Sequence, residues 1–270
     1  MGWPGASVKQ ADQERVKKEM AKNFGTQCIF LSEELIEKFY HGFCNKTLWP
    51  LFHYFPLYAE YENEFWQGYQ IVNEQFCNKV LEIYKPGDTI WVHDYHLMLL
   101  PGMIRCKIPD AIIGFFLHIP FPSYEMFKLL PRSWSEALLS GIYGSNLIAF
   151  HTHNYRTSFL LCTFRILGLK NIMGSVIYNN RGVKVEQFPM GIDYKKFEGA
   201  AKSKGVKREQ RKLKLSLSSQ KLILSIDRQY YTKGILQRLL GFEMFLNSYP
   251  EWRGKVVMMM VVIPSRTGVK

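Results

Sequence analysis

The sequence of 270 residues lacks an apolar run long enough to cross a membrane. Its longest apolar stretch, residues 256–264, has the length of a strand and falls far short of the roughly 20 residues that a membrane helix needs. The N-terminus, "MGWPGASVKQADQERVKK", also lacks the basic start and apolar core of a secretory signal. We therefore expect a cytoplasmic protein without a membrane partner.

Cysteine is scarce and lacks the C-x-x-C spacing of redox and zinc motifs. The five cysteines are odd in number and lie mostly in helical or apolar surroundings, so we expect reduced, buried thiols. A disordered composition is lacking too, because 47% of the residues are hydrophobic and 15% are aromatic, which is enough to fill a core. The cysteines are Cys28, Cys44, Cys77, Cys106 and Cys162.

Acidic residues are few, since 23 Asp and Glu stand against 35 Lys and Arg and give a net charge of +12. Such a charge suits an anionic partner, whether nucleic acid, a membrane surface or phosphorylated small molecules, and does not choose among them. Much of the excess lies in "KSKGVKREQRKLK", residues 202–214, on a predicted helix. This helix presents either a solvated face or a polyanion site.

What the sequence does contain is an alternation of apolar runs of strand length with segments of helical period. Continuous apolar runs predict strands covered on both faces, and the intervening helices make these strands parallel. The sequence thus predicts an α/β fold with a doubly wound parallel sheet. The predicted strands span residues 89–92, 111–117, 146–150, 222–226 and 256–263.

Local signals add three expectations to this layout. The apolar spacing over residues 72–83 predicts a helix. The segment 176–188 predicts a β-hairpin that turns at Asn179-Asn180 or at Arg181-Gly182. Asp193 has the position of a helix N-cap.

The basic helix and the polar "SLSSQ" after it mark the predicted domain boundary. We expect a first domain at residues 1–198, a basic linker helix at 199–220 and the start of a second domain at 221–270.

Polar side chains follow the predicted strands at their carboxyl ends. In an open parallel sheet this edge forms the ligand crevice, because the strand order reverses there. Pro120 and Pro122 restrict the turn after one strand and would hold His118 at a set position. The polar residues are His93, Asp94 and His96, then His118, then His151 and His153, then Asp227, Arg228 and Lys233, and finally Ser265 and Arg266.

Two chemistries compete for this crevice. The histidines and Asp94 would supply enough ligands for the zinc ion of a hydrolase, although they come from separate loops without a Cys partner or an H-E-x-x-H helix. Alternatively, Arg228, Lys233 and Arg266 would bind phosphate groups, with Gly234 opening the next helix at the anion-attracting end.

Six segments carry a resemblance to a known family. The sequence resembles the trehalose-phosphate synthases from "GWPG" near its start to its last residues. The resemblance implies a retaining nucleotide-sugar glycosyltransferase of the GT-B type, with two Rossmann-like domains and an incomplete second domain in this chain. The segments are "WVHDYHLMLLPGMIR", "IGFFLHIPFPSYEMFKLLP", "LIAFHTHNYRTSFL", "FPMGIDYKKF", "DRQYYTKGILQRLLGFEMFL" and "IPSRTGV".

The resemblance implies transfer of glucose from UDP-glucose to glucose 6-phosphate with retention of configuration. Arg228 and Lys233 would bind the donor diphosphate, and Asp94 and His118 would lie beside the transferred sugar. The implied acceptor residues are Trp3, Tyr40, Trp49 and Arg266. No metal, no cofactor and no nucleic acid is implied, because Arg and Lys neutralise the diphosphate, and homo-oligomer formation is left open.

Each site residue also has a structural interpretation. Tyr40 and Trp49 could be core aromatics, and His93 and His96 could orient their loop by hydrogen bonds instead of acting in acid–base chemistry. A related acceptor such as glycerol phosphate could also replace glucose 6-phosphate.

The chain departs from the family pattern at Gln229-Tyr230, where the family usually has Leu-Asp. In the family, a segment with a strand, an Arg and a Gly-Gly loop precedes "GWPG", and further donor-binding motifs follow the point that corresponds to Lys270. We therefore expect little turnover from this chain alone, and we keep a non-catalytic regulatory homologue, or a truncated subunit of a synthase complex, as the alternative.

Overall fold

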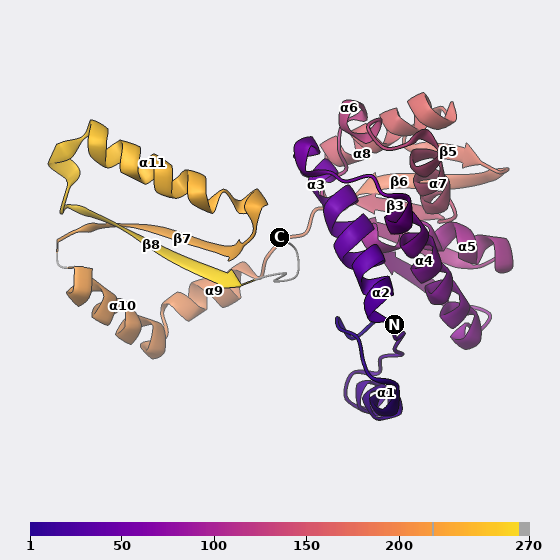
Figure 1. The fold of residues 1–270 in the computed structure, drawn as a ribbon, viewed down its shortest axis with the longest axis horizontal. Coiled ribbons are helices and arrows are strands. Elements are labelled where there is room, and N and C mark those ends of the chain that lie inside the picture. Colours follow the sequence, from indigo (N-terminus) through magenta and orange to yellow (C-terminus); the bar gives the residue numbers. More distant parts are fainter. Residues whose placement is uncertain (218, 265–270) are drawn as a thin grey trace. The chain divides into compact units, whose positions relative to one another are not determined.

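The computed structural model describes residues 1–217 and 219–264, which form two compact units (Figure 1). The first unit is Met1–Pro189 and the second begins at Met190. The division therefore falls earlier than the boundary expected at residue 198. Helix α10 (Lys204–Leu217), which covers much of the linker expected at 199–220, lies within the second unit, as does α9 (Tyr194–Ala201).

A six-stranded sheet organises the first unit, in the order β1-β2-β3-β6-β5-β4. Strands β1, β2, β3 and β6 are parallel, as the apolar runs predicted, while β5 and β4 join the edge in antiparallel pairing. Across the sheet, the described parallel strands lie in the same order as in the chain, β1-β2-β3-β6. The predicted reversal of strand order is therefore absent from them. The strands are β1 (Thr89–His93), β2 (Ile112–Leu117), β3 (Leu147–Phe150), β4 (Asn171–Ile172), β5 (Ser175–Tyr178) and β6 (Arg181–Gln187).

Helices connect these strands and cover the sheet. The helix predicted at 72–83 is the second half of the longer α4, where Val72, Phe76 and Val80 are buried as their spacing predicts. The helices of the first unit are α1 (Gln10–Phe24), α2 (Glu33–Ile36), the π-helix η1 (Glu37–Leu48), α3 (Trp49–Phe52), η2 (Pro56–Tyr58), α4 (Asn63–Ile83), η3 (Tyr95–Leu97), α5 (Leu100–Lys107), α6 (Tyr124–Phe127), α7 (Arg132–Ile142), α8 (His153–Cys162) and η4 (Thr163–Leu167).

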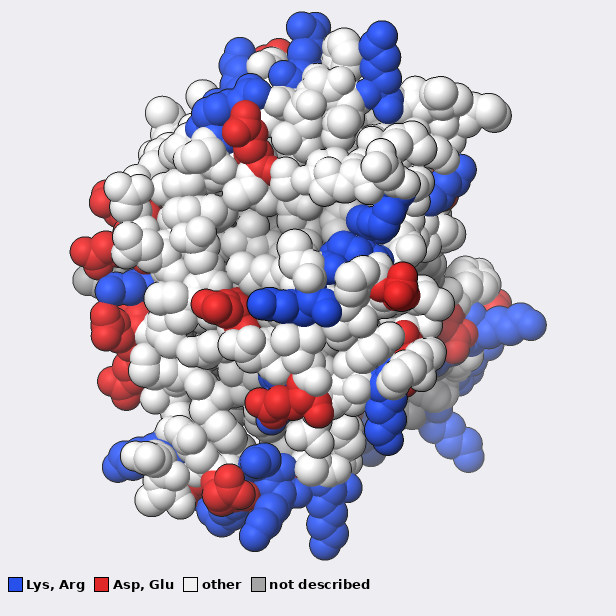
Figure 2. Space-filling view, turned by 90° about the vertical axis from the view of Figure 1, so that its right-hand side faces the viewer, with Lys and Arg blue, Asp and Glu red and all other residues white. Residues whose placement is uncertain are grey.

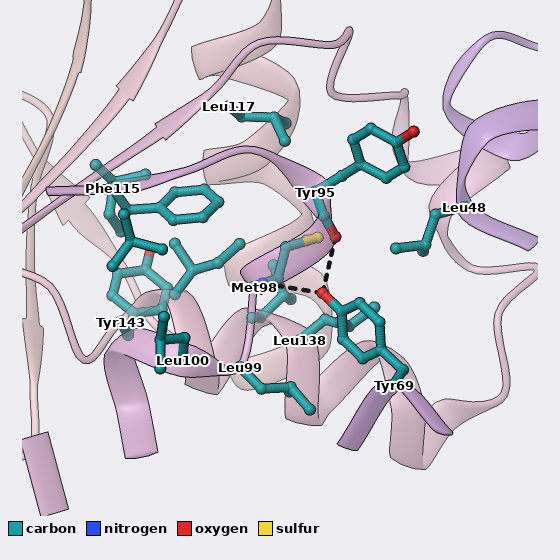
Figure 3. Close-up of a cluster of buried hydrophobic side chains, with 14 of the residues drawn as sticks. Leu48, Tyr69, Tyr95, Met98, Leu99, Leu100, Phe115, Leu117, Leu138 and Tyr143 are labelled. Atoms are coloured by element: carbon teal, nitrogen blue, oxygen red, sulfur yellow. Dashed lines mark hydrogen bonds between the residues drawn. The ribbon is translucent and has the colours of Figure 1, made fainter. Parts of the chain in front are cut away.

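The core of the first unit is largely apolar, and Figure 3 shows a polar link buried within it. The hydroxyl of Tyr69 donates a hydrogen bond to the carbonyl of Tyr95 at 2.8 Å and accepts one from the amide of Met98 at 2.9 Å. Both groups lie in the loop after β1, where the backbone makes no ladder bonds. Tyr69 thus satisfies buried backbone groups that would otherwise be costly to leave unpaired.

The predicted hairpin joins β5 to β6, and its turn is at Asn179-Asn180. Both asparagines have positive φ, 48° and 60°, and Tyr178 pairs with Arg181 across the two-residue loop. This is the geometry that a type I′ turn requires, and asparagine tolerates it better than most residues.

The second unit contains two parallel strands, β7 (Lys221–Gln229) and β8 (Val256–Pro264), with α11 (Ile235–Ser248) between them in sequence. Figure 1 shows α11 and α10 on opposite sides of the two strands. The short helices η5 (Tyr231–Lys233) and η6 (Pro250–Trp252) flank α11. The predicted Asp193 cap is confirmed, because its carboxylate accepts a hydrogen bond from the amide of Lys196 at 3.0 Å.

Coverage of the strands is less complete than the apolar runs predicted. Trp91 on β1 is 64% exposed, because β1 is an edge strand that pairs only with β2 among the described residues. Leu224 and Ile226 on β7 are 55% and 58% exposed. The inference that every strand is covered on both faces is therefore wrong for β1 and β7. None of the described helices combines the length and apolarity needed to cross a bilayer.

Candidate active site

Polar side chains gather at the carboxyl ends of β1, β2 and β3 in the first unit. The Nδ1 atom of His93 lies 2.9 Å from the Nε2 atom of His118, a hydrogen bond between the ends of two neighbouring strands. The ring of His151, just after β3, lies 5.5 Å from that of His118. Parallel strands carry their ends to one edge, so residues 25 and more positions apart meet here.

Asp94 occupies the centre of this edge in an unusual backbone conformation. Its φ of 72° is rare for a residue with a side chain, and such strain costs on the order of 1–3 kcal/mol. Two hydrogen bonds hold it in place: its amide donates to the carbonyl of Phe116 at 2.7 Å, and its Oδ1 accepts from the amide of His118 at 3.0 Å. The second carboxylate oxygen, Oδ2, makes neither of these bonds.

Partial burial lowers the pKa of His118 below its ordinary value of 6.5. The negative charge of Asp94 opposes this shift, whereas the neighbouring rings of His93 and His151 add to it. A neutral imidazole can accept one hydrogen bond and donate another. This suits the His93–His118 contact, in which one ring nitrogen carries the proton and the other accepts it.

The two prolines after His118 hold their loop against the core. Phe121, which lies between Pro120 and Pro122, is 1% exposed and packs against the rings of Phe52 and Phe127 at 5.6 and 5.1 Å. The fixed φ angles of the prolines and the buried ring between them leave the loop few alternatives. The position of His118 is thus set from both sides, by Asp94 before it and by Phe121 after it.

A row of aromatic rings runs beside Asp94 and brings together three of the residues expected to bind the acceptor. Trp3 contacts Tyr40 at 5.4 Å between ring centres, and Tyr40 stacks on His96 at 5.9 Å. His96 lies 4.0 Å from Tyr95, which lies 5.7 Å from Trp49. Tyr95 is buried, but Trp3, Tyr40 and Trp49 are half-buried: they pack against the core and keep part of their surface exposed.

Tyr40 comes from η1, a π-helix of twelve residues. Such helices are rare, usually short and frequent at functional sites, because the wider turn redirects side chains. Beside this row, a cavity of about 530 Å³ runs along the free edge of β1. Among its lining residues are Trp3, Trp91, His93 and His96.

The zinc interpretation fails on geometry in the described part of the chain. No group of three or more His, Cys, Asp and Glu side chains there is placed to hold a metal ion. His153 begins α8, and its Nε2 hydrogen-bonds the hydroxyl of Thr157 at 3.3 Å along that helix. Direct contact between the rings of His93 and His118 also uses nitrogen atoms that a metal would need.

The second unit carries Arg228 and Lys233 around the turn from β7 to α11. Both side chains are exposed. Gly234 adopts φ 60° and begins α11 without a side-chain cap, so the first amides of that helix stay available to an acceptor. Two cations near an uncapped helix N-terminus make a suitable environment for a diphosphate.

Arg238, which the sequence motifs did not predict, organises this turn. Its guanidinium pairs with Asp227 at 2.5 Å and also donates to the hydroxyl of Ser225 and to the carbonyl of Lys233. One sequence feature could have predicted this role: an Asp at the end of a strand is followed by an Arg one turn into the next helix. Arg266, which was expected to join Arg228 and Lys233, lies outside the described residues.

Comparison with known proteins identifies relatives for the whole chain. The model of glycosyltransferase family 20 matches residues 1–270. The bifunctional trehalose-6-phosphate synthase/phosphatase of Thermoproteus tenax is 44% identical over 269 residues, covering 100% of this chain and 36% of that protein. The 56 kDa subunit of the UDP-forming synthase of Saccharomyces cerevisiae is 40% identical over 274 residues, covering 100% of this chain and 55% of the subunit.

A solved structure supports the same assignment. The E. coli trehalose-6-phosphate protein bound with UDP-2-fluoro glucose has a TM-score of 0.83 and 32% identity, covering 90% of this chain and 54% of that one. The chain thus spans about a third to just over half of the length of these relatives.

Proposed function

The chain belongs to glycosyltransferase family 20, and from this membership we propose that it carries the sugar-contacting and diphosphate-binding residues of a UDP-forming trehalose-phosphate synthase. The reaction would transfer glucose from UDP-glucose to glucose 6-phosphate with retention of configuration. The observation that carries the proposal is the paired placement of Asp94 and His118, joined through the His118 amide at the carboxyl edge of the sheet.

In the first unit, the sugar of the donor would lie against Asp94 and His118. The free oxygen of the Asp94 carboxylate would accept hydrogen bonds from sugar hydroxyls, and the His118 ring would bind another hydroxyl. Rigid placement of both groups raises the rate by holding the sugar in its reactive orientation. Asp94 would orient the sugar and would not act as a nucleophile.

In the second unit, Arg228 and Lys233 would bind the diphosphate together with the amides that begin α11. Their positive charge would stabilise the negative charge that grows on UDP as it leaves. Arg238 touches neither substrate in this proposal; it positions the Lys233 segment through the carbonyl of that residue.

The half-buried rings of Trp3, Tyr40 and Trp49 would contact the acceptor sugar, and Arg266 would hold its phosphate. Aromatic faces commonly pack against sugar rings, and a guanidinium binds phosphate through two parallel hydrogen bonds. Glycerol phosphate is the alternative acceptor, and it lacks a ring for these aromatic faces to contact.

The chemical step follows from this placement. The acceptor hydroxyl oxygen forms a bond to the anomeric carbon on the face from which the diphosphate leaves. The bond from that carbon to the diphosphate oxygen breaks, and the proton of the acceptor hydroxyl passes to the departing diphosphate. No protein nucleophile takes part, so retention arises from attack on one face. The positive net charge of +12 suits two phosphate-bearing substrates.

A hybrid enzyme tests the proposal. This chain would replace the matching segment of the yeast 56 kDa subunit, and release of UDP would be measured with UDP-glucose and glucose 6-phosphate. We expect activity, and we expect Arg228→Gln to lower kcat by about 10²–10³-fold, the usual loss for one charge-stabilising group. A folded hybrid whose activity is unchanged by Arg228→Gln would refute the proposed role.

A non-catalytic regulatory homologue is the second candidate, and Gln229-Tyr230 favours it. Tyr230 packs its ring on Tyr231 at 4.6 Å, and its carbonyl accepts a hydrogen bond from the amide of Lys233 at 3.0 Å. The double change Gln229→Leu, Tyr230→Asp restores the pair typical of the family. A hybrid that is silent as it stands and active with this pair would support the regulator; one that is active in both forms would support the enzyme.

We further propose a role for each unit and a location for the protein. The first unit would serve the acceptor and the second the nucleotide sugar. The five reduced thiols favour a reducing compartment, and we propose the cytoplasm as the location, with small molecules and not nucleic acid as partners.

A further inference from the structure

A second cavity, of about 390 Å³, lies at the opposite edge of the first unit's sheet. It is bordered by α5, α7 and the turn between β5 and β6. Arg181, at the amino end of β6, lines it, and Arg105 is held there by Asn146, the residue before β3. Since β3 and β6 are parallel, their amino ends lie at the edge away from Asp94 and His118. This cavity is therefore separate from the candidate active site.

Close packing of α7 and the turn after it against α5 and the residues just before it forms the wall of the cavity. A Cβ atom on Gly141 would lie 2.5 Å from the carbonyl oxygen of Met98, and one on Gly144 would lie 2.3 Å from the amide nitrogen of Gly102. Only glycine allows this approach. The rest of the wall is largely apolar and includes Leu99 and Met103.

Two arginines, Arg105 and Arg181, line this largely apolar cavity. Arg105 is held by the carbonyl of Gly144 at 3.0 Å, by the Oδ1 atom of Asn146 at 2.8 Å and by the carbonyl of Pro109. Burial lowers the pKa of Arg105 and the nearby charge of Arg181 lowers it further, whereas the negative charge of Asp110 opposes this shift. The two positive charges are thus close enough to repel each other.

Arg181 has a donor left over. Its Nη2 atom donates to the carbonyl of Tyr143 at 2.8 Å, but its buried Nη1 atom has no hydrogen-bond partner among the residues that the structure describes. In the described part of the chain, no carboxylate lies within 4.0 Å of either guanidinium. Buried charges are normally paired, and leaving a charged donor unpaired is costly.

We propose that this cavity binds a small metabolite through an oxyanion group, a phosphate or a carboxylate, which is attracted by the positive charges of Arg181 and Arg105. The volume is within the range of small-molecule sites, and the apolar wall suits the carbon part of such a ligand. Figure 2 views the side of the molecule that carries α5 and the hairpin turn, where Lys and Arg side chains (blue) and Asp and Glu side chains (red) are interspersed.

Cys106 offers a readout confined to this cavity. It lines the cavity and is exposed, whereas the other four thiols are buried. The full chain would be treated with iodoacetamide, a neutral reagent. Mass spectrometry would then measure the rate at which the peptide that contains Cys106 is alkylated. Inorganic phosphate and succinate would be added in separate arms. At a concentration about twice its Kd, a bound anion lowers the alkylation rate about threefold if the bound form is protected.

Arg181→Gln and Arg181→Lys are the test variants, and Lys107→Gln, a neighbouring cation outside the cavity lining, is the matched control. We expect protection in the wild-type chain and in Lys107→Gln and its loss in Arg181→Gln, with circular dichroism confirming the fold. Protection by phosphate alone or succinate alone identifies the oxyanion. No protection in either arm, or protection that persists in both Arg181 variants, overturns the proposal. Neither result bears on the hybrid-enzyme assay, since the two sites are separate.

Discussion

Asp94 and His118 show how far single residues can be predicted. Their position after strands indicated the same edge, and the structure joins them through a hydrogen bond. The φ of 72° at Asp94 had no signal in the sequence, because it arises from contacts with Phe116 and His118 on the neighbouring strand. Arg238 was missed for a similar reason: its importance comes from meeting Asp227 in space.

The histidines differ in their contacts. His93 contacts His118 directly, as expected of a residue that orients its neighbour, while His153 turns onto α8. Among the thiols, Cys106 corrects the prediction that all five are buried, because it is exposed near the end of α5. A pattern of apolar neighbours in sequence cannot tell which side of a short helix faces solvent.

The protonation of His118 gives a prediction at this scale. We expect a pKa below 6.5 for His118, measured by NMR titration of its ring protons. Asp94→Asn removes the charge that favours the imidazolium, so the pKa falls further. His93→Gln removes a ring that disfavours it, so the pKa rises. His153→Gln is the control and leaves the value unchanged. Shifts of the opposite sign in the two test variants would contradict this electrostatic description.

At the scale of elements, the strands, the hairpin and the cap of α9 followed from sequence, since each has a local signal of period or turn chemistry. The π-helix η1 did not, because its residues have no periodicity that separates it from an α-helix. The exposed Trp91 was not foreseen either. Edge position depends on the order of strands, which no local pattern specifies.

The contact between α5 and α7 gives a prediction for helix packing. Gly141→Ala places a methyl group 2.5 Å from the carbonyl oxygen of Met98, which cannot move without shifting the backbone. We expect a loss of about 1–3 kcal/mol in the free energy of unfolding, measured by urea denaturation. Gly114→Ala is the matched control in the same unit, since its added Cβ meets nothing within 4 Å. Equal stability of the two variants would show that the contact is looser than described.

The turn from β7 to α11 gives a second prediction about the stability of an element. Arg238→Gln leaves Asp227 without its ion pair and frees the carbonyl of Lys233. We expect amide hydrogen exchange at the start of α11 to accelerate by about tenfold, as loss of about 1.5 kcal/mol of local stability implies. Arg253→Gln, which removes bonds to Leu246 and Asn247 at the far end of the helix, should leave those amides unchanged. Unchanged exchange in Arg238→Gln would mean that Arg238 does not hold the turn.

At the scale of the whole molecule, the α/β class and the family were predicted correctly from the run of motifs. The expected reversal of strand order did not appear among the described parallel strands, because strand order depends on which crossovers the chain makes and not on the apolar runs themselves. The chain divides between residues 189 and 190, before the basic helix that had suggested the boundary. The basic composition of residues 202–214 predicted the charged surface of α10, but it did not predict where the chain divides into two units.

The convergence of Arg228, Lys233 and Arg266 on the donor diphosphate stays a prediction, as does the contact of the donor sugar with Asp94 and His118. A crystal structure of the hybrid enzyme with UDP-2-fluoro glucose measures this directly. The account predicts the diphosphate within hydrogen-bond distance of Arg228 and Lys233, with sugar hydroxyls on Asp94 and His118. A bound donor whose diphosphate contacts neither cation, or whose sugar lies away from Asp94, would contradict it.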